Sequence, residues 1–272
     1  MSSKTILSVA INGARRQKTE NPAVPISPKE IATSVVGCAK AGAAIAHIHA
    51  RSPDGKATQE PTIYQEIIDR VADQSDIIVQ ISIGGLGFSI DELLAPLVIE
   101  PEMASFPLRA LNAADSDPLH DIRKMASRMR TCGVRPELDA SSLPMLEGAL
   151  SLNNERMFEE PLCFGFVMGD VEDMAEGAAR LLSFRERVPQ ASQWWAMKGG
   201  VNACGIAALA ISLGGHARTG FEDTVHDLRT GDLAPNNEHL VAALADLSCK
   251  LGREPASPKE ARAMLSMVPR SQ

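Results

Sequence analysis

Two histidines spaced two residues apart are the strongest chemical signal in this 272-residue chain. His47 and His49 lie in the segment 45–51, an apolar stretch typical of a short buried strand, which the turn-forming residues 52–55 follow at once. Side chains two apart on a strand share a face, so both imidazoles are expected to point the same way. Paired imidazoles at a strand end favour a transition-metal site, although two unrelated histidines on a polar face would give the same pattern.

The elements that must position these histidines alternate regularly along the chain. Apolar strand patterns cover residues 5–11, 43–49, 76–81, 103–106, 134–138, 162–168, 194–198 and 216–220. Helical patterns cover residues 28–40, 63–74, 90–98, 118–132, 143–152, 171–183, 203–213 and 236–251, and a short helix is expected after Ser257. Eight such units imply a parallel sheet with helical crossovers, and eight is the number that closes a barrel.

We therefore expect one α/β domain, a (β/α)8 TIM barrel over residues 1–272. The alternative is an open doubly wound sheet, but no Gly-x-Gly-x-x-Gly motif opens the first helix. In a TIM barrel the active site lies at the carboxyl ends of the strands. Polar residues gather at those ends, namely Asn12, Arg15, Arg16, His47, His49, Arg51, Ser82, Gly84, Gly85, Glu137, Asp139, Lys198, Asn202, Arg218, Glu222 and Asp223.

A third metal ligand is expected close to the two histidines, because catalytic zinc sites commonly use three protein ligands and keep one position open. Strands two and eight flank strand one in a closed barrel, and strands of the same parity contribute to the same interior layer. Glu222, just after strand eight, is thus the best-placed third ligand, and two histidines with one glutamate suit Zn²⁺. His216 begins strand eight, so we expect it at the opposite, structural end of the barrel.

Three further features allow two interpretations each. Asp223 could be a general base that Arg218 orients, or residues 222–223 could be a solvated acidic helix start. Gly84-Gly85 could hold a phosphate with backbone N–H groups or simply form a tight turn. Arg15 could steer an anionic ligand or lie in a solvated loop.

The bulk composition excludes several classes of partner. The net charge of −7 argues against nucleic acid and anionic membranes. No run of about 18 apolar residues could span a bilayer, and no signal peptide is evident. The five cysteines are scattered without a Cys-x-x-Cys pair, which is typical of a reduced, cytoplasmic protein.

Taken together, these segments resemble the β-keto acid cleavage enzyme family. The resemblance rests on residues 12–16, 43–51, 84–85, 101–105, 136–137, 214–223 and 253–262. It implies a TIM barrel, usually a homotetramer, that exchanges a β-keto acid and acetyl-CoA for an acyl-CoA and acetoacetate. It also implies a role for each matching residue: His47, His49 and Glu222 as Zn²⁺ ligands, Asp223 as base, Arg218 and Glu137 in catalysis, and Ser82, Gly84, Gly85, Asn12 and Arg15 in substrate binding.

The sequence departs from the family pattern at residues 106–109, 138–141 and 198–202, so we expect an altered substrate pocket. Ala14 and the small number of aromatic residues favour a substrate with a neutral or anionic side chain. Two alternatives remain: a metal-dependent hydrolase on the same barrel, and a non-catalytic protein that senses keto acids. Hydrolases of this kind normally add a Lys or a further His from middle strands, and no His follows strand five or six.

Overall fold

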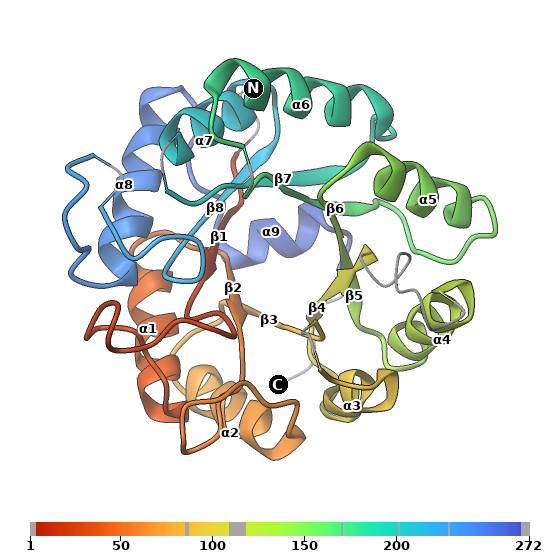
Figure 1. Ribbon diagram of the computed structural model, residues 1–272, viewed down its shortest axis with the longest axis horizontal. Coiled ribbons are helices and arrows are strands. Elements are labelled where there is room, and N and C mark those ends of the chain that lie inside the picture. Colours follow the sequence, from red (N-terminus) through yellow and green to blue (C-terminus); the bar gives the residue numbers. More distant parts are fainter. Residues whose placement is uncertain are drawn as a thin grey trace.

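The computed structural model describes residues 4–84, 87–108, 118–169, 171–200, 202–227 and 229–267. Within them, eight parallel strands close into one barrel in sequence order, and β8 pairs with β1 (Figure 1). The strands are β1 (Leu7–Ala10), β2 (Ile45–Ile48), β3 (Ile78–Ile81), β4 (Met103–Pro107), β5 (Arg135–Ala140), β6 (Cys163–Val167), β7 (Gln193–Met197) and β8 (His216–Thr219). The predicted TIM-barrel fold is confirmed.

Helices form the outer ring around the barrel. They are α1 (Pro28–Lys40), α2 (Pro61–Ala72), α3 (Ile90–Leu94) with the 3₁₀ helix η1 (Ala95–Ile99), α4 (Pro118–Thr131), α5 (Leu143–Asn153), α6 (Met174–Arg187), α7 (Ala203–Ser212), α8 (Asn237–Lys250) and α9 (Pro258–Met264). α1 begins where predicted, because Ser27 and Glu30 form a reciprocal capping box and Pro28 occupies the first turn. None of the described helices is both long and apolar enough to cross a membrane.

Two of the helices that differ from the sequence prediction have a clear physical cause. The expected helix 90–98 is α-helical only to Leu94 and continues as η1, since Pro96 lacks the N–H that an α-helical bond needs. The helix expected over 171–183 begins later, at Met174, because the Asp173 side chain accepts a hydrogen bond from the Glu176 N–H and caps it there.

The amino-terminal end of the barrel is closed by α9, which Figure 1 shows behind the ring of strands. Ala261 and Leu265 pack there against interior residues from the lower ends of several strands, including Ile45, Ile78 and Trp195. His216 is buried at this end: its Nδ1 accepts a hydrogen bond from the Ile6 N–H, and its Nε2 contacts Gln193 Oε1 at 2.9 Å. The expected structural position of His216 is thereby confirmed.

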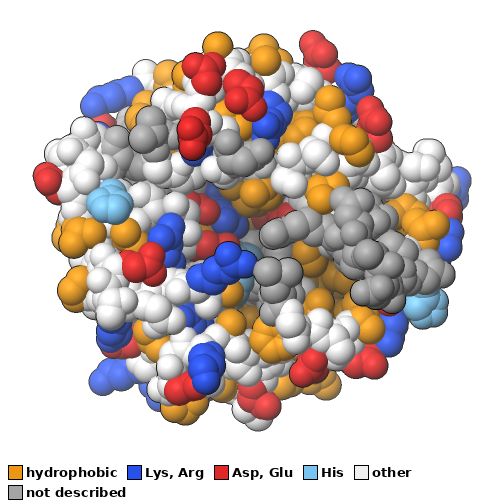
Figure 2. All heavy atoms as spheres, in the orientation of Figure 1, with side chains coloured by type: hydrophobic (Ala, Val, Ile, Leu, Met, Phe, Trp, Pro, Cys, Tyr) orange, Lys and Arg blue, Asp and Glu red, His pale blue; other side chains and the backbone are white. Residues whose placement is uncertain are grey.

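The carboxyl end of the barrel interior is polar by contrast. Strand register places His47 beside Gln80, and Ser105 beside Glu137. All four of these residues are at most 3% exposed. On the same face, seen in Figure 2, acidic and basic side chains lie along one side of a central hollow. The fold thus gathers these buried polar side chains at the end where barrel enzymes work.

Candidate metal centre and active site

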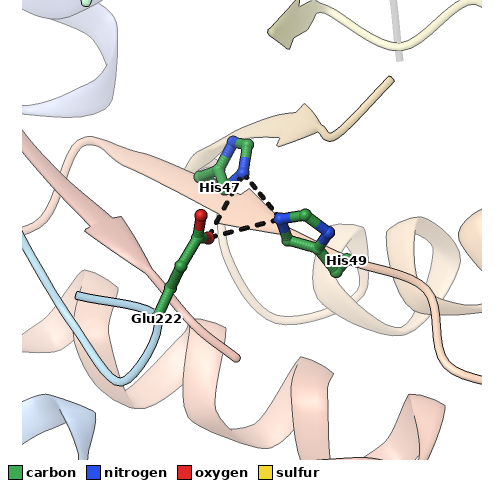
Figure 3. A group of neighbouring side chains, drawn as sticks. All are labelled: His47, His49 and Glu222. Atoms are coloured by element: carbon green, nitrogen blue, oxygen red, sulfur yellow. Dashed lines mark hydrogen bonds and ion pairs between the residues drawn. The ribbon is translucent and has the colours of Figure 1, made fainter. Parts of the chain in front are cut away.

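His47, His49 and Glu222 converge at the carboxyl end of the barrel (Figure 3). The two histidines come from β2 and the residue after it, and Glu222 comes from the loop after β8. Glu222 Oε2 lies 3.4 Å from His47 Nε2 and 3.3 Å from His49 Nε2, and the two Nε2 atoms are 3.2 Å apart. Both histidines are buried, at 3% and 8% exposed. The structure thus brings together the three residues predicted as ligands.

The donor set fits a divalent cation. Gln80 Oε1 lies 2.8 Å from His47 Nδ1, so this nitrogen carries the proton and the Nε2 lone pair faces the other two groups. Burial lowers the pKa of His47 to about 3, which keeps the ring neutral. Glu222 Oε2 is buried without a hydrogen-bond partner in the described structure. Two imidazole nitrogens and one carboxylate oxygen, all turned inward, match a catalytic zinc site.

Asn12 holds the backbone of His49. Its Oδ1 accepts a hydrogen bond from the His49 N–H at 3.1 Å, and its Nδ2 donates to the His49 carbonyl at 2.9 Å. Asn12 itself is completely buried. The structure therefore places this side chain against a metal-ligand candidate, and its predicted contact with substrate stays a prediction.

Arg218 and Asp223 form a bidentate ion pair beside the three ligand candidates. Arg218 donates from Nε to Asp223 Oδ2 at 3.0 Å and from Nη2 to Oδ1 at 2.7 Å. The same Nη2 lies 3.4 Å from Glu222 Oε1. Both side chains of the pair are about nine-tenths buried. A single guanidinium therefore orients both carboxylates.

This arrangement shifts the pKa values of Glu222 and Asp223 in opposite directions. Burial opposes the charge on Glu222, but Arg218 and the two histidines outweigh it and hold the pKa of Glu222 well below its ordinary value. Burial raises the pKa of Asp223, and the neighbouring Glu222 charge adds to this, while Arg218 opposes both. Glu222 is thus the more readily ionised of the two acids, as a metal ligand requires, whereas Asp223 is the more basic carboxylate. Acids whose pKa values are pushed apart in this way are suited to separate roles.

Glu137 lies on β5, with its side chain directed into the barrel interior. Burial raises its pKa, Arg218 opposes the shift, and the charge of Glu222 reinforces it. Gly165 on β6 leaves room for this carboxylate, because a Cβ there would lie 3.3 Å from Glu137 Oε1 and only 2.4 Å from Asp139 Oδ1. Two acidic side chains therefore face the interior from one strand.

The remaining predicted substrate-binding residues are Ser82, Gly84, Gly85 and Arg15. Ser82 is buried after β3, and its Oγ accepts a hydrogen bond from the Gly84 N–H at 3.4 Å. The Gly84 carbonyl accepts from Gln59 Nε2. Arg15 is exposed, and Gly85 lies outside the described residues. Their roles in binding substrate stay predictions.

Two contacts at the centre were missed by sequence reasoning. Gln80, which orients His47, sits two residues before Ser82 on β3, so period-two alternation from Ser82 could have placed it on the interior face. Arg16 donates from Nε to the Glu222 carbonyl at 3.4 Å. No sequence signal separates Arg16 from Arg15, because both lie in one irregular loop.

Comparison with known proteins identifies the family of this chain. Residues 4–267 match the family model for the beta-keto acid cleavage enzyme. A 3-keto-5-aminohexanoate cleavage enzyme from Fusobacterium nucleatum subsp. nucleatum is 35% identical over 98% of this chain and 99% of that protein. A 3-oxoadipate:acetyl-CoA acetyltransferase from Cupriavidus necator is 31% identical over 98% of this chain and 96% of that protein.

Solved structures share the fold. The apo structure of ObcA aligns with a TM-score of 0.74 at 20% identity, covering 90% of this chain and 66% of that one. At this identity the likeness concerns the barrel alone. The family match extends over nearly the whole described chain, and a relative above 30% identity covers almost all of it. The chain therefore belongs to the beta-keto acid cleavage enzyme family and is an enzyme.

Proposed function

We propose that this enzyme is a Zn²⁺-dependent catalyst of the exchange β-keto acid + acetyl-CoA → acyl-CoA + acetoacetate. The observation that carries the proposal is the adjacency of two groups on one loop. Glu222 lies against His47 and His49 in a group that could hold a metal ion, and the next residue, Asp223, is a buried carboxylate held by Arg218. Acetyl-CoA as co-substrate is supported by a relative that is a 3-oxoadipate:acetyl-CoA acetyltransferase.

The reaction must begin at the carbon between the keto group and the carboxylate of the substrate. A zinc ion at His47, His49 and Glu222 would supply positive charge that makes this carbon more acidic. Asp223 is the base that removes its proton, and Arg218 keeps the carboxylate fixed for the transfer. The raised pKa of Asp223 suits this task, because a more basic carboxylate accepts a carbon-bound proton more readily.

The remaining steps exchange one carbon–carbon bond for another. The deprotonated carbon bonds to the acetyl carbon of acetyl-CoA and releases the CoA thiolate. The thiolate then adds to the original keto carbon, and the bond between that carbon and the deprotonated carbon breaks. Acyl-CoA and acetoacetate leave, and the proton held by Asp223 returns to the acetoacetate carbon. No oxidant, reductant or water is consumed.

Substrate binding is assigned to residues around the central hollow. We propose that Ser82 and Glu137 contact the keto acid, with Gly84, Gly85, Asn12 and Arg15 at the edge of the site. Glu137 and Asp139 face the interior close to Gly165. An amidohydrolase-type site is less consistent with this lining, since β5 and β6 contain no His or Lys.

The enzyme is also proposed to be cytoplasmic and homotetrameric. All five cysteines are free thiols, and three of them are buried, as expected for a reducing compartment. The tetramer rests on the family resemblance alone. Light scattering coupled to size-exclusion chromatography measures the oligomer, and a monomeric mass would overturn this assignment.

A substrate panel tests the proposed activity. Purified enzyme is incubated with acetyl-CoA and β-keto acids that carry neutral, anionic or cationic side chains, and acyl-CoA products are separated by chromatography. We expect one class to be converted, with activity lost after zinc is removed by a chelator and restored by added Zn²⁺. His47→Ala should lose both zinc and activity. If no substrate gives an acyl-CoA product, the proposal is refuted. If His47→Ala keeps full activity, the metal assignment is refuted.

A further inference from the structure

Arg51 is a buried cation whose hydrogen bonds all go to backbone carbonyls. It is 2% exposed. Its Nη1 donates to the Gly13 carbonyl at 2.8 Å, its Nη2 to the Arg16 carbonyl at 3.0 Å, and its Nε to the Gly55 carbonyl at 2.9 Å. Within the described chain it forms no ion pair with a carboxylate. Burying such a charge is costly, so these bonds must hold the connected loops firmly in place.

Two of the three carbonyl partners lead directly to Glu222. Gly13 lies against this side chain so closely that a Cβ on Gly13 would come within 2.8 Å of Glu222 Cγ. Arg16 donates from Nε to the Glu222 backbone carbonyl at 3.4 Å. Arg51 therefore holds Gly13, which packs against the Glu222 side chain, and Arg16, which donates a hydrogen bond to the Glu222 backbone carbonyl. The three loops follow β1, β2 and β8, which are neighbours in the barrel (Figure 1).

We propose that Arg51 is a positioning residue for Glu222, acting through Gly13 and Arg16 to hold this carboxylate where it can complete a metal centre with His47 and His49. The inference rests on the proposed function, since it takes the three residues as metal ligands. Arg51 does not contact substrate or metal in this role. Its effect is on how well the third ligand is pre-positioned, and thus on metal affinity and coordination geometry.

Arg253 is a matched control at the other end of the barrel. It is 8% exposed, and its guanidinium donates to the carbonyls of Ile211, Gly215 and Lys4 at 2.7, 2.6 and 2.9 Å. Removing either arginine takes away a buried guanidinium with three carbonyl partners. Among the contacts of the described residues, those of Arg51 lead to Glu222 and those of Arg253 lie at the closed end, so the pair separates positioning of Glu222 from general support of the fold.

The test compares Arg51→Met with Arg253→Met. Zinc affinity is measured by competition with a chromogenic chelator, the visible spectrum is recorded on Co²⁺-substituted protein, and urea unfolding is followed on metal-free protein. We expect both variants to unfold at lower urea. Arg51→Met alone should weaken zinc binding by roughly tenfold or more and alter the cobalt spectrum. An unchanged affinity and spectrum in Arg51→Met would overturn the inference.

A second pair keeps the test decisive if Arg51→Met does not fold. Gly13→Ala and Gly133→Ala both place alanine at a positive φ, +60° and +63°, but the alanine Cβ meets Glu222 only at position 13 and nothing within 4 Å at position 133. Weaker zinc binding in Gly13→Ala alone supports the inference, and equal affinities overturn it. Wild-type protein that binds no zinc overturns the proposed function as well. Tight wild-type binding that a folded Arg51→Met leaves unchanged, or that Gly13→Ala leaves unchanged where Arg51→Met does not fold, overturns this inference alone.

Discussion

Gln80→Met should weaken zinc binding without touching a ligand. Gln80 Oε1 accepts the Nδ1 proton of His47 at 2.8 Å, and Gln80 is completely buried. A metal at His47 Nε2 requires the proton to stay on Nδ1. In the variant, a metal-bound His47 has a buried N–H with no acceptor, whereas metal-free His47 can move its proton to Nε2. The cost of the lost hydrogen bond therefore falls mainly on the metal-bound state.

The magnitude follows from that asymmetry. A buried donor left without a partner costs about 1–3 kcal/mol, and each 1.4 kcal/mol is about a factor of ten in affinity. We therefore expect the zinc dissociation constant to rise by roughly ten- to hundredfold, the range usual for residues that orient a metal-bound histidine. Competition with a chromogenic chelator at pH 7.5 measures this constant directly.

Gln193→Met is the matched control for this prediction. Gln193 Oε1 contacts His216 Nε2 at 2.9 Å, so the same type of histidine–amide bond is lost at the closed end of the barrel. The control should lose stability but keep its zinc affinity, and Gln80→Glu should retain affinity because a carboxylate is also an acceptor. Equal zinc affinities for Gln80→Met and the wild type would refute the tautomer reasoning.

Further predictions concern the base and the buried histidines. Asp223→Asn should keep zinc bound but lower the rate of acyl-CoA formation by about 10²- to 10⁴-fold, the usual worth of a general base; an active variant would reassign that role. Burial lowers the pKa of His47 and of His216 from 6.5 to about 3. The unfolded chain therefore binds more protons than the folded one between those values, so stability falls as pH falls through this window. In urea unfolding of the metal-free protein, each histidine should change the free energy of unfolding by about 1 kcal/mol per pH unit in this window. His216→Gln should remove the contribution of one histidine from the slope against pH. An unchanged slope would contradict the assignment of His216 as neutral.

Much of this architecture could be predicted, because it depends on simple periodicities. Alternation along β2 placed His47 and His49 on one face, and the closure of eight strands brought the loop after β8 beside them. Glu222 could therefore be chosen as the third ligand candidate without knowing any distance. The position of His216 at the closed end followed from its place at the start of β8.

The supporting contacts were harder to predict, since they depend on side-chain direction in irregular loops. Asn12 follows β1 as a substrate-binding residue would, yet its amide turns onto the His49 backbone. In the sequence, Arg51 looks like one more polar residue at a strand end. In the structure, its guanidinium donates hydrogen bonds to three backbone carbonyls. No periodic sequence pattern predicts the direction of these two side chains, because the conformation of a loop depends on long-range packing.

An isotope experiment tests the central claim most directly. Zinc-loaded enzyme is incubated with an accepted, unlabelled β-keto acid and acetyl-CoA that carries ¹³C at both acetyl carbons, and the products are read by NMR and mass spectrometry. The proposed bond exchange puts both labelled carbons into the acetyl half of acetoacetate, and the new acyl-CoA stays unlabelled. Label in the acyl-CoA or only in free acetate, or an unlabelled acetoacetate, would contradict the account.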